Sequence, residues 1–360
     1  MSGFFQSSYQ QARTAFLRAV QADSRVQWKK ALLHPLHGAE AEPLALDAVW
    51  LGRMDARRLL VLQSATHGIE GFAGSAVQVA VLHQALTLPE DTALLLLHAM
   101  NPWGFSHRRR VDEAGIDLNR NFVDFSQPPE NTGYKELADA LIPAHWTLEA
   151  LATADQRLAD FREVYGEQIY EEAVSGGQYT HPRGLFYGGR APGWSRLQLQ
   201  HLAEELRLAE RDAVAIIDVH TGLGEWSVGE IICDHPPRSI GVEWARAWYG
   251  DAVTEPFLGT SSSVPKWGLI DFFWHQLLPD RCSFVTLEYG TGSTEQLFNV
   301  LRADHWLATQ AVGQVDAALK NRIQAELLEH FCPAATDWRQ AVVQQGLLRV
   351  RQALEGLSKV

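Results

Sequence analysis

The chain has 360 residues, of which 46% are hydrophobic and 21% charged, and its formal net charge is −12 at pH 7. This composition can bury a sizeable core, so it excludes disordered, collagen-like and coiled-coil proteins, and it argues against a basic surface for nucleic acid or anionic membrane. The 3 cysteines, Cys233, Cys282 and Cys332, lie far apart without a CxxC motif, which excludes a disulfide scaffold and a cysteine-based zinc module.

The chain shows no targeting signal or membrane span. Apolar runs such as 93–97 are too short to cross a bilayer. The first twenty or so residues lack a basic leader followed by an apolar stretch and a cleavage site. We therefore expect a soluble, cytoplasmic protein that binds neither membranes nor nucleic acids.

A helix and a strand are expected in the first fifty or so residues. Residues 8–22 place apolar side chains on one helical face, which predicts a helix packed on the core. Loop signals beginning at residue 34 then precede a strand-like alternation over 44–50, where Leu44, Leu46, Ala48 and Trp50 share one face.

Strand and helix patterns then alternate. Short apolar runs at 57–66 and 92–102 are typical of buried strands, and the segment 72–86 between them is typical of a helix. A further helix at 197–212 precedes a buried strand at 213–222. This order is the βαβ signature of a mainly parallel sheet.

The remaining segments complete one expected domain, 1–360. Another buried strand is predicted at 281–292, and the chain from 294 to 360 is mostly helical with a break near Pro333. Residues 124–190 resemble an insertion rich in polar loops and helix. The sequence contains no internal repeat, low-complexity tract or obvious linker, which favours a single domain.

Ionisable side chains follow three of the predicted strands. They are His67 with Glu70, then His220, then Glu288. In open α/β sheets, sites form beyond the carboxyl ends of strands. We therefore expect these groups to meet.

His67, Glu70 and His220 are the donor types of a catalytic zinc site, which leaves one position for water. The alternatives are a glutamate placed against a helix dipole and a hydrogen-bonded histidine at a strand end. Glu288 follows an apolar run, so it must be solvated, paired or functional. A general base is the functional interpretation, and a solvent-facing carboxylate is the alternative.

The segment 108–122, RRRVDEAGIDLNRNF, is the most distinctive motif in the chain. Its arginines and an asparagine can bind a carboxylate and stabilise a developing oxyanion. Asp117 can accept the second ring N–H of a ligand histidine. The alternatives are a solvated basic loop or an RNA contact, and net acidity without interleaved aromatics argues against RNA.

The motifs HGIE, NPWGF, RVDEAGIDLNRNF, DVHTG and TLEYGTG, in this order, resemble the zinc carboxypeptidase clan, peptidase family M14. The chain looks especially similar to the bacterial branch described as a domain of unknown function, DUF2817. The resemblance covers most of the chain, from the N-terminal helix through TLEYGTG. It implies a three-layer α/β/α fold with a mixed, mainly parallel sheet.

The resemblance implies one Zn²⁺ ion held by His67, Glu70 and His220, with Glu288 as the general acid and base. It assigns the carboxylate clamp to two residues of DLNRNF, Asn119 and Arg120.

The same resemblance implies that Arg110 stabilises the oxyanion, with Arg109 as the second candidate, and that Asp117 orients the first histidine. Digestive peptidases of this type also use a tyrosine that closes over the substrate. Tyr249 and Tyr289 are candidates for that role without a supporting motif.

Three functions are compatible with these motifs. The leading one is a metallocarboxypeptidase that removes a C-terminal residue from a peptide. The second is a deacylase of N-acyl amino acids or similar small amides, because the related branch that includes aspartoacylase and succinylglutamate desuccinylase keeps the same motifs. The third is a non-catalytic binding protein, which the complete ligand set disfavours. The expected partner is a peptide or N-acyl amino acid with a free carboxylate, and a homo-oligomer is left open.

Overall fold

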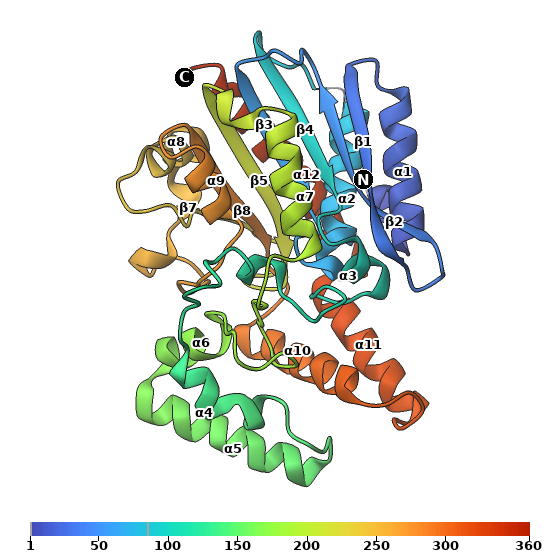
Figure 1. Cartoon of the computed structure of the whole chain (residues 1–360), viewed down its shortest axis with the longest axis vertical. Helices are drawn as coiled ribbons and strands as arrows, with labels where there is room; N and C mark the ends of the chain where they lie inside the picture. The colour runs from blue at the N-terminus through green and yellow to red at the C-terminus, as the bar shows by residue number, and fades with distance from the viewer. Residues whose placement is uncertain (1, 85) are drawn as a thin grey trace.

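The computed structural model describes residues 2–84 and 86–360 and contains an eight-stranded sheet covered by helices (Figure 1). The strand order is β1-β2-β4-β3-β5-β8-β6-β7. The strands are β1 (Val26–His37), β2 (Pro43–Leu51), β3 (Arg58–Ser64), β4 (Thr92–His98), β5 (Ala213–Thr221), β6 (Gly229–Ile232), β7 (Val253–Thr254) and β8 (Cys282–Tyr289).

The middle of the sheet is parallel. Strands β4, β3, β5 and β8 pair in parallel, and so do β6 and β7, whereas the β1–β2, β2–β4 and β6–β8 pairs are antiparallel. The chain passes from β3 through a helix to β4 on one side, while β5 lies on the other side of β3. Such a switch point leaves a crevice at the carboxyl ends of the strands.

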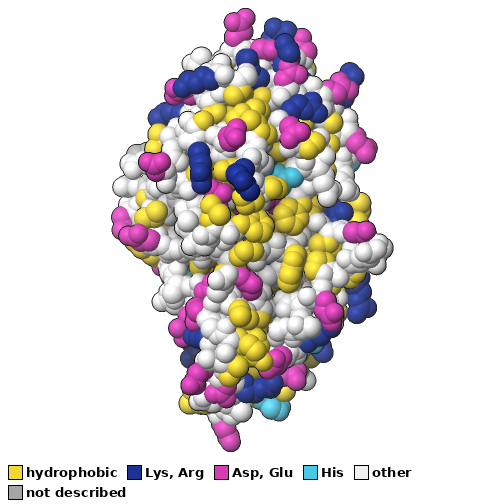
Figure 2. All heavy atoms as spheres, turned by 90° about the vertical axis from the view of Figure 1, so that its left-hand side faces the viewer, with side chains coloured by type: hydrophobic (Ala, Val, Ile, Leu, Met, Phe, Trp, Pro, Cys, Tyr) yellow, Lys and Arg dark blue, Asp and Glu magenta, His cyan; other side chains and the backbone are white. Residues whose placement is uncertain are grey.

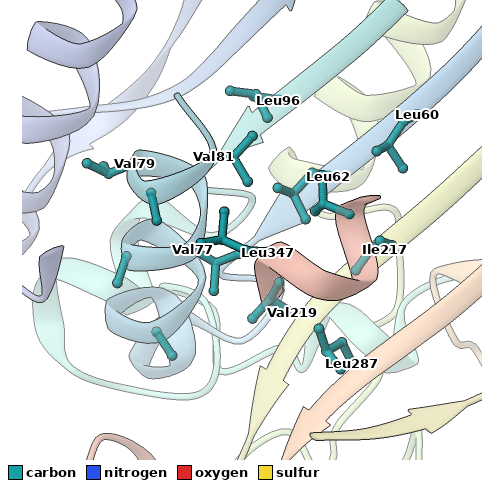
Figure 3. Packing of buried hydrophobic residues seen from close by; sticks show 14 of the residues in the cluster. Leu60, Leu62, Val77, Val79, Val81, Leu96, Ile217, Val219, Leu287 and Leu347 are labelled. Atoms are coloured by element: carbon teal, nitrogen blue, oxygen red, sulfur yellow. The ribbon is translucent and has the colours of Figure 1, made fainter. Parts of the chain in front are cut away.

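Helices cover both faces of the sheet. One face carries α1 (Tyr9–Ala22), α2 (Gly71–Gln84), α8 (Ile240–Tyr249) and α12 (Thr336–Leu357), and the other carries α7 (Trp194–Glu205) and α9 (Asp271–Leu277). Alternate residues of the central strands lie in two hydrophobic cores, one on each face of the sheet. Leu60 and Leu62 pack toward α2 and α12 (Figure 3), and Leu59 and Val61 pack toward α7. The expected three-layer α/β/α arrangement is confirmed.

Five helices lie beyond one end of the sheet, in the lower part of Figure 1. They are α4 (Thr132–Leu141), α5 (Leu148–Tyr165), α6 (Glu167–Ser175), α10 (Thr294–Thr309) and α11 (Ala317–Phe331). They share a hydrophobic cluster that includes Phe161, Phe298 and Phe331. Helix was predicted for both 124–190 and 294–360, and the break expected near Pro333 lies between α11 and α12.

Short elements complete the described chain. They are α3 (Pro102–His107) and the 3₁₀ turns η1 (Ser2–Phe4), η2 (Gly68–Glu70), η3 (Leu118–Arg120), η4 (Leu208–Glu210), η5 (Gly250–Ala252) and η6 (Pro256–Leu258). The helix predicted for 72–86 is α2, and residue 85 of that prediction lies outside the described residues. The helix predicted for 197–212 ends earlier, at Glu205.

One expectation about the start of the sheet is wrong. The loop signals at 34–37 belong to the end of β1, a twelve-residue strand that was not predicted. Proline is tolerated on an edge strand because one side of that strand needs no ladder hydrogen bonds. Pro35 lies in the edge strand β1, where the register shifts between Leu33 and His37. The proline is therefore accommodated within the strand and does not end it.

The surface agrees with the acidic composition. On the face drawn in Figure 2, acidic side chains are spread widely and basic ones occur singly or in small groups. Among the described residues, no helix is both long and apolar enough to cross a membrane.

Candidate metal centre

The predicted ligand residues meet at the carboxyl ends of the parallel strands. His67 follows β3 and opens the turn η2, which carries Glu70, while His220 is the next-to-last residue of β5. His220 is the register partner of Glu288 on β8. The backbone of the η2 turn is fixed by hydrogen bonds from Gly68 N and Ile69 N to the carbonyls of Arg110 and Arg109, respectively.

Three donor atoms converge at this point. His67 Nδ1 lies 2.9 Å from Glu70 Oε1 and 3.1 Å from His220 Nδ1. His220 Nδ1 lies 3.0 Å from Glu70 Oε2. All three side chains are buried, and Glu70 is only 1% exposed.

This donor set fits a zinc ion. Zinc in proteins takes imidazole nitrogen and carboxylate oxygen at about 2.0–2.2 Å, so tetrahedral ligand atoms lie about 3.4 Å apart. The observed separations are within a few tenths of an ångström of that spacing. A small adjustment of side chains would therefore allow His67, Glu70 and His220 to hold one ion.

Carboxylates fix the ring orientation of both histidines. His67 Nε2 lies 3.0 Å from Asp117 Oδ1, and His220 Nε2 lies 2.7 Å from Asp218 Oδ2. Such carboxylate contacts keep the proton on Nε2 and leave Nδ1 free to bind a metal. Although burial raises the pKa of Asp117, the Arg110 guanidinium holds it well below its usual range, so Asp117 stays ionised as an acceptor.

Asp218 was not assigned a role from the sequence. The sequence did contain a pattern that could have identified it. Asp218 and His220 are two residues apart in β5, and residues two apart in a strand lie on the same face. The Asp218 carboxylate also accepts a hydrogen bond from Thr66 Oγ1 at 2.8 Å. It is therefore held in place from the β3 side of the site.

The guanidinium of Arg110 lies directly against the ligand set. Its Nε donates to Asp117 Oδ2 at 3.0 Å and its Nη1 to Glu70 Oε1 at 3.1 Å. Its Nη2 lies 2.8 Å from His67 Nε2. A guanidinium only donates, so this last contact is not a hydrogen bond when His67 Nε2 carries the proton directed at Asp117. In that state Arg110 Nη2 is free to donate to another acceptor in the cleft.

Glu288 stands beside the ligand set in the same cleft. Its Oε1 accepts a hydrogen bond from Leu223 N at 3.1 Å. Burial, with the nearby Glu70 carboxylate adding to it, raises the pKa of Glu288 to about 8. A bound cation would favour the ionised form. The carboxyl group is therefore suited to exchange a proton near neutral pH.

Asn119 and Arg120 lie in the turn η3 and line the same cleft. Asn119 Oδ1 accepts a hydrogen bond from Ile270 N at 2.8 Å, which leaves its amide N–H groups for another partner. The buried Arg120 guanidinium donates to the carbonyls of Ser175 and Asn119. Burial lowers the pKa of Arg120 to about 10, so it remains cationic at neutral pH. Together they offer donors and a positive charge to an anion.

Three candidates are not brought to the cleft. Arg109, the second candidate for stabilising the oxyanion, instead binds Asp304 on α10 at 2.9 Å and lines a separate pocket. Tyr249, the last residue of α8, is buried in the core, and Tyr289 Oη donates to Val342 O. Successive residues of β8 point to opposite sides of the sheet, which turns Tyr289 away from Glu288. No tyrosine lines the cleft among the described residues.

The cleft has an empty volume of about 780 Å³ when the open solvent at its mouth is included. Its walls come from β5, β8, α6 and α10, so it lies between the sheet and the helices beyond it. Four charged lining residues were not predicted from the sequence: Glu171, Asp234, Lys266 and Asp271. They lie outside recognisable motifs, in α6, a loop after β6, a loop before α9 and the first position of α9, respectively.

Comparisons with known proteins agree with the motifs. A family model described as "Protein of unknown function (DUF2817)" matches residues 5–345. No curated protein sequence matches the chain. The family match confirms the resemblance that the motifs indicated.

Solved structures that are similar to this chain have low sequence identity to it. Thrombin activatable fibrinolysis inhibitor is 13% identical, with a TM-score of 0.53 over 98% of this chain and 74% of that one. A metallo-carboxypeptidase from Pseudomonas aeruginosa is 13% identical, with a TM-score of 0.40 over 96% of this chain and 71% of that one. The succinylglutamate desuccinylase from Chromobacterium violaceum is 17% identical, with a TM-score of 0.37 over 89% of this chain and 74% of that one.

Proposed function

The chain belongs to the DUF2817 family, and we propose that it is a zinc-dependent hydrolase, specifically a metallocarboxypeptidase that cleaves the last amide bond of a peptide. The observation that carries this proposal is the convergence of His67, Glu70 and His220 beside Glu288 in one cleft. Each of these groups alone has a structural explanation. Their convergence matches the needs of amide hydrolysis, which requires an activated water, a base and a stabilised oxyanion.

The protein groups have distinct roles in this mechanism. His67, Glu70 and His220 would hold a zinc ion, which would supply a Lewis acid for the amide carbonyl and for water. Glu288 accepts a proton from the attacking water and then gives it to the leaving amine. Arg110 donates hydrogen bonds to the amide oxygen as negative charge develops there.

Asn119 and Arg120 hold the free carboxylate of the substrate. Arg120 supplies the charge, and the free amide N–H groups of Asn119 supply directional donors. A carboxylate fixed at this end of the cleft places the adjacent amide bond toward Glu288 and the candidate ligands. Such positioning accounts for a requirement for a free C-terminus.

The alternative is a deacylase of N-acyl amino acids with the same catalytic groups. The space in the cleft that a water-sized molecule can occupy is only about 80 Å³, which favours this second candidate. The two activities differ in whether the acyl side of the substrate is a peptide chain or a small acid. Both leave an amino acid with its carboxylate between Asn119 and Arg120.

Mass spectrometry of reaction products tests the proposal. Zinc-loaded protein is incubated with matched peptides that have free or amidated C-termini, together with N-acylated amino acids. The proposal predicts loss of one residue from free-ended peptides and none from amidated ones. Cleavage of the N-acyl amino acids alone would replace it with the deacylase, and no cleavage of any substrate would contradict the proposed hydrolase.

A further inference from the structure

One aromatic ring contacts both arginines that the proposed function assigns to the substrate. The guanidinium carbon Cζ of Arg110 lies 5.3 Å from the centroid of the Phe186 ring, and Cζ of Arg120 lies 5.3 Å from the same centroid. Both distances are below the limit of about 6 Å within which a cation is attracted to the face of an aromatic ring. Phe186 lines the cleft and is 3% exposed, so water competes little with these contacts.

The two guanidiniums carry like charges in a buried site. Burial lowers the pKa of Arg120 to about 10, and the positive charge of Arg110 adds to this shift, whereas the Asp117 carboxylate opposes it. Asp117 binds Arg110 directly, while Arg120 donates to two backbone carbonyls. The face of an aromatic ring carries partial negative charge. The Phe186 ring therefore supplies an attraction that both cations share.

The backbone holds Phe186 in an unfavourable conformation. Its φ is 52°, in the left-handed region that bulky residues rarely adopt. The neighbouring chain fixes this geometry, because Gln178 N donates to Phe186 O at 3.1 Å and Asp117 N donates to Tyr187 O at 2.8 Å. The second hydrogen bond joins the residue after Phe186 to the segment 108–122, which carries both arginines. Backbone strain of this kind is concentrated at functional sites, where the surrounding structure maintains it.

The proposed mechanism needs a fixed spacing between the two arginines. Arg120 holds the substrate carboxylate and Arg110 the developing oxyanion, and in the substrate these two groups are only a few covalent bonds apart. A displacement of about 1 Å in such a site can cost about a hundredfold in rate. A single ring that contacts both guanidiniums can maintain the spacing, because moving either guanidinium away from the ring weakens its attraction.

We propose that Phe186 is a positioning residue whose ring holds Arg110 and Arg120 at the spacing that the substrate requires. This inference rests on the proposed function, because that function assigns the two arginines to the oxyanion and the carboxylate. The ring acts through the arginines and takes no part in making or breaking bonds. Loss of the ring should therefore lower kcat through Arg110 and raise KM through Arg120.

Matched leucine substitutions separate the ring from its contribution to packing. Phe186→Leu keeps an apolar side chain without a ring face, and it should lower kcat/KM for a free-ended peptide at least about tenfold because both cations lose their attraction to the ring. Phe161→Leu makes the same change in the same hydrophobic cluster and should leave kcat/KM near the wild-type value. An equal loss in the two variants would show that packing alone is responsible and would overturn the proposal.

Fluorinated phenylalanines at position 186 test the electrostatic nature of the contact. Each added fluorine withdraws electron density from the ring face and changes the size of the ring little, so the attraction for a guanidinium weakens in steps. The value of kcat/KM should fall progressively from phenylalanine to mono-, di- and trifluorinated phenylalanine. This measurement still decides the question if Phe186→Leu does not fold. A kcat/KM that does not depend on fluorination would overturn the proposal.

A binding measurement separates this inference from the proposed function. Calorimetry measures the affinity of the zinc-loaded protein for free leucine, whose carboxylate is expected at Asn119 and Arg120, across the same fluorinated series. If no peptide is cleaved but the affinity for leucine falls with each added fluorine, the role of Phe186 stands while the hydrolase fails. If peptides are cleaved but neither the affinity nor kcat/KM depends on fluorination, the hydrolase stands and the role of Phe186 fails. Absence of both cleavage and leucine binding would contradict both.

Discussion

His67 and His220 present the same ring nitrogen, Nδ1, to the candidate metal site. Each Nε2 faces a buried carboxylate, Asp117 for His67 and Asp218 for His220. These carboxylates favour a proton on Nε2 of each ring, which leaves Nδ1 available to an ion. Individual side chains should therefore affect different quantities. Loss of a carboxylate that orients a histidine should weaken metal binding, whereas loss of Glu288 should reduce turnover.

Replacing Asp218 tests the orienting role of its carboxylate. Asp218→Asn should weaken zinc binding by about 10–100-fold, because the His220 ring loses its charged acceptor. The zinc dissociation constant is measured by competition with a chromophoric chelator. Asp212→Asn, a change at an exposed site just before β5, serves as the control and should bind zinc as wild type does. Unchanged affinity in Asp218→Asn would show that this contact does not orient the ligand.

Replacing Glu288 separates binding from chemistry. Glu288→Gln keeps the shape of the side chain and the acceptor for Leu223 N but cannot take a proton. Turnover should fall by about 10²–10⁴-fold, the usual worth of a general base, while zinc content stays near one ion per chain. Initial rates and elemental analysis of the same preparation give both values. Normal turnover in this variant would remove Glu288 from the mechanism.

At the scale of elements, the segment between α3 and η3 joins the candidate ligands to the substrate clamp. Its backbone fixes the η2 turn through Gly68 and Ile69, and its side chains supply Arg110 and Asp117. Asp112 supports this segment, since its Oδ1 accepts hydrogen bonds from Ala114 N and Ile116 N at 2.9 and 2.8 Å. Burial, with Glu113 adding to it, raises the pKa of Asp112 from 3.8 to about 7.

This shift predicts how stability depends on pH. Between pH 4 and pH 7 the folded state holds a proton on Asp112 that the unfolded state has released, so stability falls as pH rises through this window. Asp112→Asn, which resembles the protonated form, should gain stability relative to wild type at pH 8 and little at pH 4. Urea unfolding at the two pH values measures the difference. Asp251→Asn at an exposed site is the control, and an equal effect of Asp112→Asn at both pH values would contradict the account.

The elements that carry the ligands were predictable because each is a short apolar run with polar groups at its end. Strands β3, β5 and β8 all have this pattern, and the motif order then assigned His67, His220 and Glu288 to one edge of the sheet. Strand β1 was not predicted because half of its side chains are solvent-facing and Pro35 mimics a turn signal.

The inner end of the cleft was not predictable by the same means. Asp271 and Asp234 come from a helix start and a loop, positions where carboxylates are common and carry no distinctive spacing. Tertiary packing alone brings them to the wall that contains Asn119. The sequence motifs therefore identified the candidate metal ligands and Glu288, but not these additional charged residues of the cleft.

At the scale of the whole molecule, the candidate ligands join segments that are far apart in the chain. His67 and Glu70 follow β3, His220 lies on β5, and residues of α6 and α10 line the cleft beside them. An ion that binds only when these segments are assembled stabilises the folded state over the unfolded state. The effect is about 4 kcal/mol when free zinc is 1,000 times its dissociation constant.

Chelation should therefore lower the melting temperature of the protein, and added zinc should restore it. Differential scanning calorimetry with and without a chelator measures the change. The melting temperature of the Glu70→Gln variant should be the same with and without chelator, because this variant has lost the carboxylate ligand. A chelator effect that persists unchanged in Glu70→Gln would place the stabilising ion elsewhere.

Anomalous X-ray diffraction at the zinc edge, on crystals of the zinc-loaded protein, tests the metal centre most directly. The account predicts one peak per chain, about 2.0–2.2 Å from His67 Nδ1, His220 Nδ1 and a Glu70 oxygen. It also predicts that the Nε2 atoms of both rings face Asp117 and Asp218 and not the ion. A peak at another place, or coordination through Nε2, would contradict the proposed centre and the mechanism that depends on it.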